Sequence, residues 1–249
     1  MASAAVNGAA QPKIVYYNNR RCPWAHRSSI VLKELNLPFE EVTIDLDTPR
    51  PQWYLDINPR GLVPTIKYTG GALTDEIIPE SAIVAQFLAD NHPSHLTLPS
   101  TTEDGRGALF RARVSFFVDA WFSKVNSKMY PTLLAGTEEE KEKLGQEMLA
   151  AVEKEIEPLL KEAGPYFGGS SRLTMAEVLT APFVIRVQSF ANADFLPKTL
   201  GDGLKKLPNF SKWADALRQH ESVMWVYDEQ GILEGTEKRL NKMRAAAKM

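Results

Sequence analysis

The pattern of apolar and polar positions divides the chain into two parts with different periodicities. In the first part, short runs with the alternation of a strand are interspersed with stretches that have the spacing of a helix. An alternation of strands and helices is typical of an α/β domain with a mixed sheet. The predicted strands cover 14–17, 39–46 and 62–68, with a short partner strand from 72, and the predicted helices cover 23–35 and 81–90.

Beyond residue 104 the strand pattern nearly disappears, and apolar residues recur at the spacing of helices. One helical stripe runs from Phe110 through Trp121 to Met129, and another runs from Leu144 to Leu159. Further helices are expected from Thr174, over 208–220 and over 233–246. We therefore expect a flexible tail over 1–13, an α/β domain over 14–91, a linker over 92–104 and an all-α domain over 105–249.

Composition and charge narrow the range of functions. Hydrophobic residues make up 44% and charged residues 24% of the 249 residues, values typical of a globular protein. The net charge of −2 gives no basis for recruiting nucleic acid or anionic lipid. Because no apolar run approaches the length of a membrane span, we expect neither a nucleic-acid nor a membrane partner.

The two ends of the chain bear on where the protein works. Residues 1–13 lack the basic start and the apolar centre of a secretory signal, so we expect a cytoplasmic protein. The last three residues, Ala247-Lys248-Met249, are a relaxed version of the Ser-Lys-Leu address that the peroxisomal import receptor reads. Minor peroxisomal targeting is therefore a second expectation.

The cysteine count restricts the chemistry. Cys22 is the only cysteine, so neither an internal disulfide nor a zinc site of several thiolates can form. The four histidines show no metal-ligand spacing, and we expect no metal cofactor. Ala25 stands where a dithiol oxidoreductase has its second cysteine. A small cellular thiol must then complete any redox cycle, and glutathione is the abundant candidate.

Cys22 lies where a predicted strand meets a predicted helix. Pro23 suits the first helical position, which places the Cys22 sulfur beside free backbone N–H groups and the positive end of the helix dipole. Arg20, Arg21 and Arg27 add positive charge nearby in the sequence, so we expect a depressed pKa for Cys22 and a reactive thiolate. The alternative is a buried cysteine that packs as a small apolar residue.

Two further segments suit a glutathione site. Pro64 enters a predicted strand, and a cis Val63–Pro64 bond would let the Val63 backbone pair with a short peptide. The alternative is a plain edge-strand proline. Glu80 and Ser81 open the second predicted helix, where a helix N-terminus, a hydroxyl and a carboxylate suit the α-amino acid end of a γ-glutamyl group. The alternative there is simple helix capping by Ser81.

These segments together resemble the cytosolic glutathione transferases over about residues 14–245. Cys22 and the three residues after it resemble the omega-class signature, in which cysteine stands where other classes have tyrosine or serine. The segment 58–65 resembles the family's cis-proline segment. Residues 167–177 resemble the capping box of its second domain, although Glu177 stands where the family usually has aspartate. Thr174 and Glu177 still fit a capping box.

The resemblance implies a fold and a set of roles. It implies an N-terminal thioredoxin-like domain with a mixed sheet and helices, then an all-helical C-terminal domain, assembled as a homodimer. It implies that Cys22 is the nucleophile and forms a mixed disulfide with glutathione, and that Arg50 pairs with the glycyl carboxylate. The alternative for Arg50 is an ordinary surface arginine. The implied glutathione-binding residues are Pro23, Trp24, Arg50, Val63, Pro64, Glu80 and Ser81.

The acceptor-substrate pocket is the least defined part of the site, because aromatic residues at helical spacing more often belong to a core. The resemblance favours a glutathione-dependent thioltransferase, dehydroascorbate reductase or deglutathionylase in redox chemistry or detoxification. Its substrates would be small electrophilic, disulfide or glutathionylated compounds. Two alternatives stay open, a non-enzymatic binding or scaffold module and a chloride-channel-like relative that inserts in membranes. The pocket candidates are Trp121, Phe122, Phe183, Arg186 and Trp225.

Overall fold

The computed structural model describes residues 11–101 and 105–246. Its first part is built on a mixed sheet of four strands in the order β2-β1-β3-β4. β1 pairs with β2 in parallel, and the β1–β3 and β3–β4 pairs are antiparallel. The mixed sheet predicted from the alternation is thus confirmed. The strands are β1 (Lys13–Asn18), β2 (Glu40–Thr43), β3 (Thr65–Gly70) and β4 (Leu73–Pro79).

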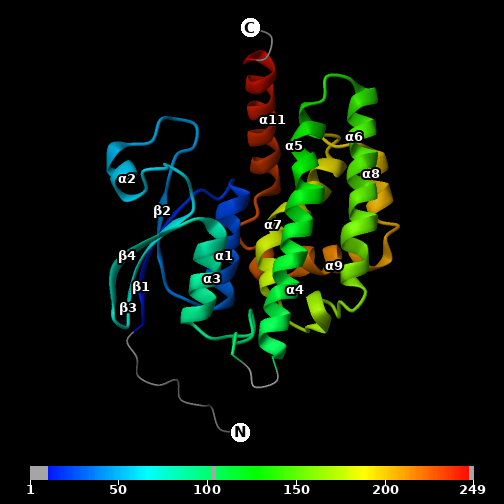
Figure 1. Cartoon of the computed structure of the whole chain (residues 1–249). Helices are drawn as coiled ribbons and strands as arrows, with labels where there is room; N and C mark the ends of the chain where they lie inside the picture. The colour runs from blue at the N-terminus through cyan, green and yellow to red at the C-terminus, as the bar shows by residue number, and fades with distance from the viewer. Residues whose placement is uncertain (1–10, 102–104, 247–249) are drawn as a thin grey trace.

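Two helices lie between this sheet and the helical part of the chain (Figure 1). They are α1 (Pro23–Glu34) and α3 (Ser81–Asn91), and they pack against each other and against a long helix of the second part, α7. A third helix, α2 (Gln52–Ile57), was not predicted. It has six residues of which only Tyr54 is buried, so it offers no helical period to detect.

The second part is helical throughout the residues described, as predicted. The apolar stripe from Phe110 to Met129 does not form one regular helix, because a π-helical turn over Trp121–Asn126 separates α4 from α5. A second π turn over Val152–Ile156 follows α6. The main helices are α4 (Arg106–Ala120), α5 (Ser127–Leu134), α6 (Glu138–Ala151), α7 (Met175–Asn192), α8 (Lys198–Leu204), α9 (Pro208–Gln219), α10 (Glu221–Met224) and α11 (Glu229–Ala246).

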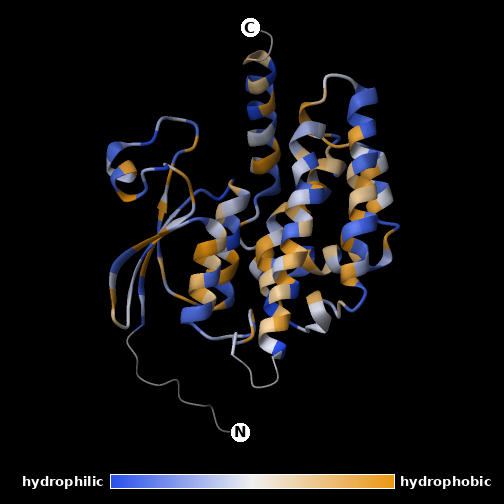
Figure 2. Ribbon diagram, viewed as in Figure 1, coloured by the Kyte–Doolittle hydropathy of each residue, from blue (hydrophilic) through white to orange (hydrophobic). Residues whose placement is uncertain are grey.

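The helix α7 runs through the centre of the helical part, and nearly all its residues are buried. Figure 2 shows apolar residues concentrated on α1, α3, α4 and α7, where the two parts of the chain face each other. The predicted capping box at the start of α7 is confirmed. Thr174 Oγ1 accepts from the Ala176 N–H at 3.1 Å, and the Glu177 carboxylate accepts from the Thr174 N–H at 2.8 Å.

Two expectations about the ends of the chain are not addressed by this structure. Residues 247–249, which carry the possible peroxisomal address, and most of the predicted tail lie outside the described residues. Within the described residues, no helix combines the length and the apolar character that a bilayer crossing requires.

Candidate active site around Cys22

Cys22 is the N-cap residue of α1, and Pro23 occupies the first helical position, as the sequence indicated. The half-buried sulfur lies 3.8 Å from the backbone carbonyl oxygen of Val63, toward which its S–H points. The Val63–Pro64 bond is cis. The thiol of one segment and the main chain of the other therefore meet at one place, although 41 residues separate them.

The pKa of Cys22 in this ligand-free chain lies above, not below, the ordinary value of a thiol. Burial raises it, and this effect outweighs the backbone N–H groups of Ala25 and Trp24, which lower it. The predicted depression of the pKa is therefore wrong for the free protein. The helix-start geometry favours the thiolate as expected, but desolvation of the thiol has the larger effect on its pKa.

Two of the arginines expected to assist the thiolate are occupied elsewhere. Arg20 pairs with Glu41 at 2.6 Å, and Arg21 pairs with Asp47 at 2.6 Å. Glu41 lies in β2 and Asp47 in the loop after it. Because β2 runs parallel to β1, these acidic groups lie near the end of β1. The positive charges of Arg20 and Arg21 are therefore neutralised by these two carboxylates and do not act on Cys22 as free charges.

The cations that do act on Cys22 come from the helical part of the chain. Arg186 of α7 and Arg239 of α11 both lower the pKa of the thiol. The Arg186 guanidinium is buried and donates to the carbonyl oxygens of Pro182 and Arg21 at 2.7 and 3.3 Å. Burial lowers the pKa of Arg186 to about 10, so it stays charged at neutral pH.

His26 is the histidine nearest to Cys22 in the sequence, but the structure does not give it the role of a general base. Burial lowers the pKa of His26 to about 3, and the adjacent Arg186 charge lowers it in the same direction. The neutral ring is held between Arg186 Nη1, 3.3 Å from its Nδ1, and the Val223 carbonyl oxygen, 2.7 Å from its Nε2. It bridges α1 to the helical part, because both of its ring nitrogens face groups of that part and, within the described structure, neither bonds to the sulfur.

The residues predicted to hold the γ-glutamyl end lie at the start of α3. Glu80 is the N-cap residue with a positive φ of 71°, and its side chain makes no capping hydrogen bond but pairs with Arg60. Ser81 is the first helical residue, so it is not the cap, and the simple capping alternative is wrong. Its hydroxyl accepts from Arg27 Nη1 at 3.1 Å.

Arg50 braces the loops beside this region. Its guanidinium donates to the carbonyl oxygens of Gly61, Asp45 and Thr48, at 3.0, 2.5 and 2.7 Å. These bonds tie the chain before α2 to the chain that leads to Val63. Arg50 is therefore more than an unattached surface arginine, and a role toward a glycyl carboxylate stays a prediction.

The five pocket candidates lie in four different places. Phe122 and Phe183 pack with Trp24, with ring centroids 4.7 to 5.4 Å apart, and Arg27 lies over all three rings. Arg186 lies beside the Cys22 loop, as described above. Trp24, Arg27 and Phe122 also line an open cavity of about 460 Å³ between α1, α3 and α4.

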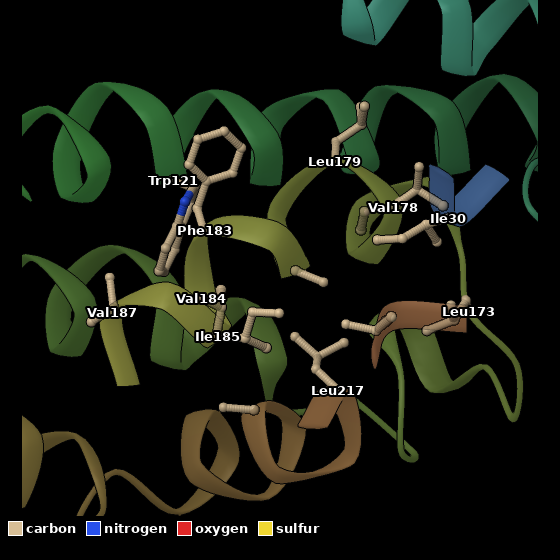
Figure 3. Packing of buried hydrophobic residues seen from close by; sticks show 14 of the residues in the cluster. Ile30, Trp121, Leu173, Val178, Leu179, Phe183, Val184, Ile185, Val187 and Leu217 are labelled. Carbon is tan, nitrogen blue, oxygen red and sulfur yellow. The ribbon is translucent and has the colours of Figure 1, made fainter. Parts of the chain in front are cut away.

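The two tryptophans among the candidates have different surroundings. Trp121 is fully buried in the core, where its ring stacks on Phe210 with centroids 6.3 Å apart. Figure 3 shows it among the apolar side chains of α7, including Phe183 and Val184. Trp225 packs against Phe39, just before β2, and not against the Trp24 cluster. Trp121 therefore belongs to the core, as the alternative held, whereas Trp225 is only partly buried and its place in an acceptor pocket stays a prediction.

Three residues near the site were not predicted from the sequence. Arg60 pairs with Glu80. Arg239 lies over the ring of Tyr130, and Tyr130 in turn interacts electrostatically with Arg186. Arg60 lies inside the proline segment 58–65, so its position near the site could have been predicted from the sequence. Tyr130 and Arg239 are 109 positions apart and carry no local signal, because only the docking of α11 on α5 brings them together.

The raised pKa of Cys22 leads to a first prediction. Iodoacetamide alkylation of the ligand-free protein should accelerate with pH up to and beyond the ordinary thiol pKa of about 8.5, because burial penalises the thiolate. Arg186→Gln should move this profile to still higher pH, since it removes a cation that favours the thiolate. The measurement is the alkylation rate as a function of pH.

The control for this prediction is Arg20→Gln, which removes an equal charge that is already paired with Glu41. It should leave the profile in place. A wild-type profile with its midpoint below that of a free thiol would contradict this account of the site.

Comparison with known proteins places this geometry in context. Residues 21–91 match the family model described as glutathione S-transferase, N-terminal domain. The chain is 26% identical to glutathione S-transferase omega-1 of Sus scrofa, over 86% of this chain and 80% of that protein. It is 28% identical to glutathione S-transferase omega-1 of Mus musculus, over 87% of this chain and 81% of that protein.

Comparison with solved structures also finds similarity to an omega-class glutathione transferase. The crystal structure of glutathione transferase Omega 1C from Trametes versicolor superposes with a TM-score of 0.77 at 26% identity, covering 92% of this chain and 97% of that one. The matched portion includes both the sheet and the helical part. The thioredoxin-like first part followed by a helical second part, expected from the sequence, is therefore confirmed.

Proposed function

This chain belongs to the glutathione transferases, with relatives in the omega class, and from that premise we propose that it is a glutathione-dependent thioltransferase with Cys22 as its nucleophile. One observation carries the proposal. The only thiol of the chain lies at a helix N-terminus, 3.8 Å from the main-chain carbonyl oxygen of Val63. A hydroxyl at this position would support conjugation, whereas a thiol can itself enter a disulfide.

The reaction follows from that thiol. The Cys22 thiolate attacks the sulfur of the glutathionyl group in a glutathione adduct, forming a Cys22–glutathione disulfide and releasing the other half of the adduct with its electron pair. A second glutathione thiolate then attacks the glutathionyl sulfur, giving glutathione disulfide and regenerating the Cys22 thiolate. Sulfur and charge balance in both steps.

A raised thiol pKa is compatible with this chemistry. A small thiolate fraction suffices, because cysteine is intrinsically nucleophilic even when only a few per cent is ionised, and a more basic thiolate is the stronger nucleophile. Because His26 is held neutral by burial and by Arg186, the thiol proton leaves through solvent or the incoming substrate. The buried guanidinium of Arg186 then offsets the negative charge on sulfur.

In this proposal the remaining predicted residues hold glutathione. The Val63 backbone pairs with the cysteinyl part as an added strand, beside Pro64, and Pro23 and Trp24 flank the sulfur. Glu80 accepts from the γ-glutamyl ammonium, while Ser81 and the α3 N-terminus hold its carboxylate. Arg50 faces the glycyl end.

Turnover with glutathione and hydroxyethyl disulfide tests the proposed function. A thioltransferase produces glutathione disulfide continuously, whereas a binding or scaffold module with the same fold does not. Glutathionylated peptides and dehydroascorbate, assayed under the same conditions, then separate deglutathionylation from dehydroascorbate reduction. Absence of turnover with every acceptor would remove the enzymatic proposal.

The ion pair of Glu80 gives a second prediction. Glu80→Gln should weaken glutathione binding about tenfold, because it removes one charge-assisted bond to the ammonium while keeping the side-chain volume. Arg60→Gln is the matched control, since it removes the partner of Glu80 but leaves the carboxylate. It should leave the affinity unchanged or slightly higher. Calorimetric titration with glutathione measures both, and equal losses in the two variants would contradict the assignment of Glu80.

A further inference from the structure

The surface formed by α5 and α11 carries a cation over an aromatic ring. The Arg239 guanidinium carbon of α11 lies 5.3 Å from the ring centroid of Tyr130 on α5. Figure 1 shows α11 standing beside α5. Both side chains reach solvent, and Tyr130 is 39% exposed. A cation stacked on a ring in this way presents a flat surface and a positive charge together.

The same helix α11 lies against the residue that precedes Cys22. Gly235 of α11 lies against the Arg21 side chain, so that an added Cβ would come within 3.5 Å of it. Arg239 is four residues further along α11, which places it on nearly the same face of the helix. The helix α11 also packs on α5 and α7, the helices that carry Tyr130 and Arg186.

Within the part of the chain that the structure describes, the guanidinium groups of Arg186 and Arg239 are not paired with carboxylates. Arg186 has only carbonyl and imidazole acceptors, and Arg239 has no carboxylate within ion-pair distance among residues 11–101 and 105–246. Asp47, which lies nearby, is already paired with Arg21.

We propose that Tyr130 and Arg239 form a subsite for the half of the substrate that leaves, and that this subsite selects flat, aromatic groups bearing a carboxylate. The inference rests on the proposed thioltransferase function and names its acceptor class. The ring of Tyr130 takes the aromatic face, and the guanidinium of Arg239 pairs with the carboxylate. When Cys22 attacks the glutathionyl sulfur, the leaving thiolate departs on this positive side of the cleft.

The experiment compares two probes that differ in one charge. They are the mixed disulfides of glutathione with 4-mercaptobenzoate, which is anionic, and with 4-mercaptobenzamide, which is neutral and of the same shape. The values of kcat/KM are measured for the wild type and for three variants, Arg239→Gln, Tyr130→Leu and Lys238→Gln. Comparing each variant with the wild type on the same probe removes the intrinsic reactivity of the two disulfides.

Arg239→Gln should lower kcat/KM for the anionic probe about fivefold, the scale of one solvent-accessible ion pair, and leave the neutral probe nearly unchanged. Tyr130→Leu should lower kcat/KM for both probes, because both lose the aromatic face. Lys238→Gln removes the same charge from the neighbouring position, whose side chain leaves α11 about 100° further around the helix, and should change neither value.

Two results would overturn the inference, and they are distinguishable. If the wild type turns over both probes and Arg239→Gln lowers both equally, or neither, the subsite is wrong while the thioltransferase function stands. If the wild type turns over neither probe nor hydroxyethyl disulfide, the proposed function fails and the subsite fails with it.

Discussion

Cys22→Ser is expected to lower turnover with glutathione and hydroxyethyl disulfide by about a thousandfold or more, to the uncatalysed background. The chain holds no other thiol, and the thioethers of its seven methionines cannot form a disulfide with glutathione. Removing the thiol removes the covalent intermediate and not merely part of its stabilisation. The measurement is steady-state production of glutathione disulfide.

The control for this variant is its folded state. Cys22 is partly buried and serine is close to cysteine in size, so serine fits with little change in packing. Unchanged far-ultraviolet circular dichroism and unchanged glutathione affinity should accompany the loss of turnover. Substantial residual disulfide exchange by Cys22→Ser would show that another group carries the chemistry.

The second large effect concerns stability. Glu177→Ala is expected to lower the free energy of unfolding by about 3–5 kcal/mol, because it leaves several buried donors without an acceptor. The Glu177 side chain is fully buried, and its oxygens accept from the backbone N–H groups of Phe167 and Thr174, each at 2.8 Å. They also accept from the Thr174 hydroxyl at 2.7 Å and from the indole N–H of Trp213 at 2.8 Å.

Urea denaturation measures this loss, with Thr174→Ala as the comparison. Thr174→Ala removes the cap and one donor while leaving the carboxylate its other partners, so it should cost only about 1–2 kcal/mol. A loss below about 1 kcal/mol in Glu177→Ala would contradict the central position given to this carboxylate.

The elements that the sequence predicted well are those whose apolar residues repeat over several turns or strand positions. α1 begins at Pro23, because a proline at the first helical position loses no hydrogen bond. α7 begins after Thr174, because Thr174 and Glu177, three residues later, form a capping box. α2 escaped prediction because it is shorter than two turns. The π turn at Trp121 also escaped, because an extra residue in one turn leaves the apolar stripe almost intact.

The site shows the same division between local and distant information. The position of Cys22 at a helix start was predictable, since three consecutive residues decide it. Its pKa was not, because burial and the long-range charges of Arg186 and Arg239 decide it together. Trp121 was misassigned for a related reason. An aromatic residue at helical spacing looks the same whether the far side of its helix meets a cleft or, as here, a packed core.

The most direct test of the proposed function is to observe its intermediate. Protein mixed briefly with a glutathionylated substrate, quenched with acid and weighed by mass spectrometry should carry one glutathionyl group, located on the peptide that contains Cys22. Addition of glutathione should remove that group at least as fast as the enzyme turns over. Turnover without this adduct, or an adduct that glutathione releases far more slowly than turnover, would contradict a mixed disulfide at Cys22 as the catalytic intermediate.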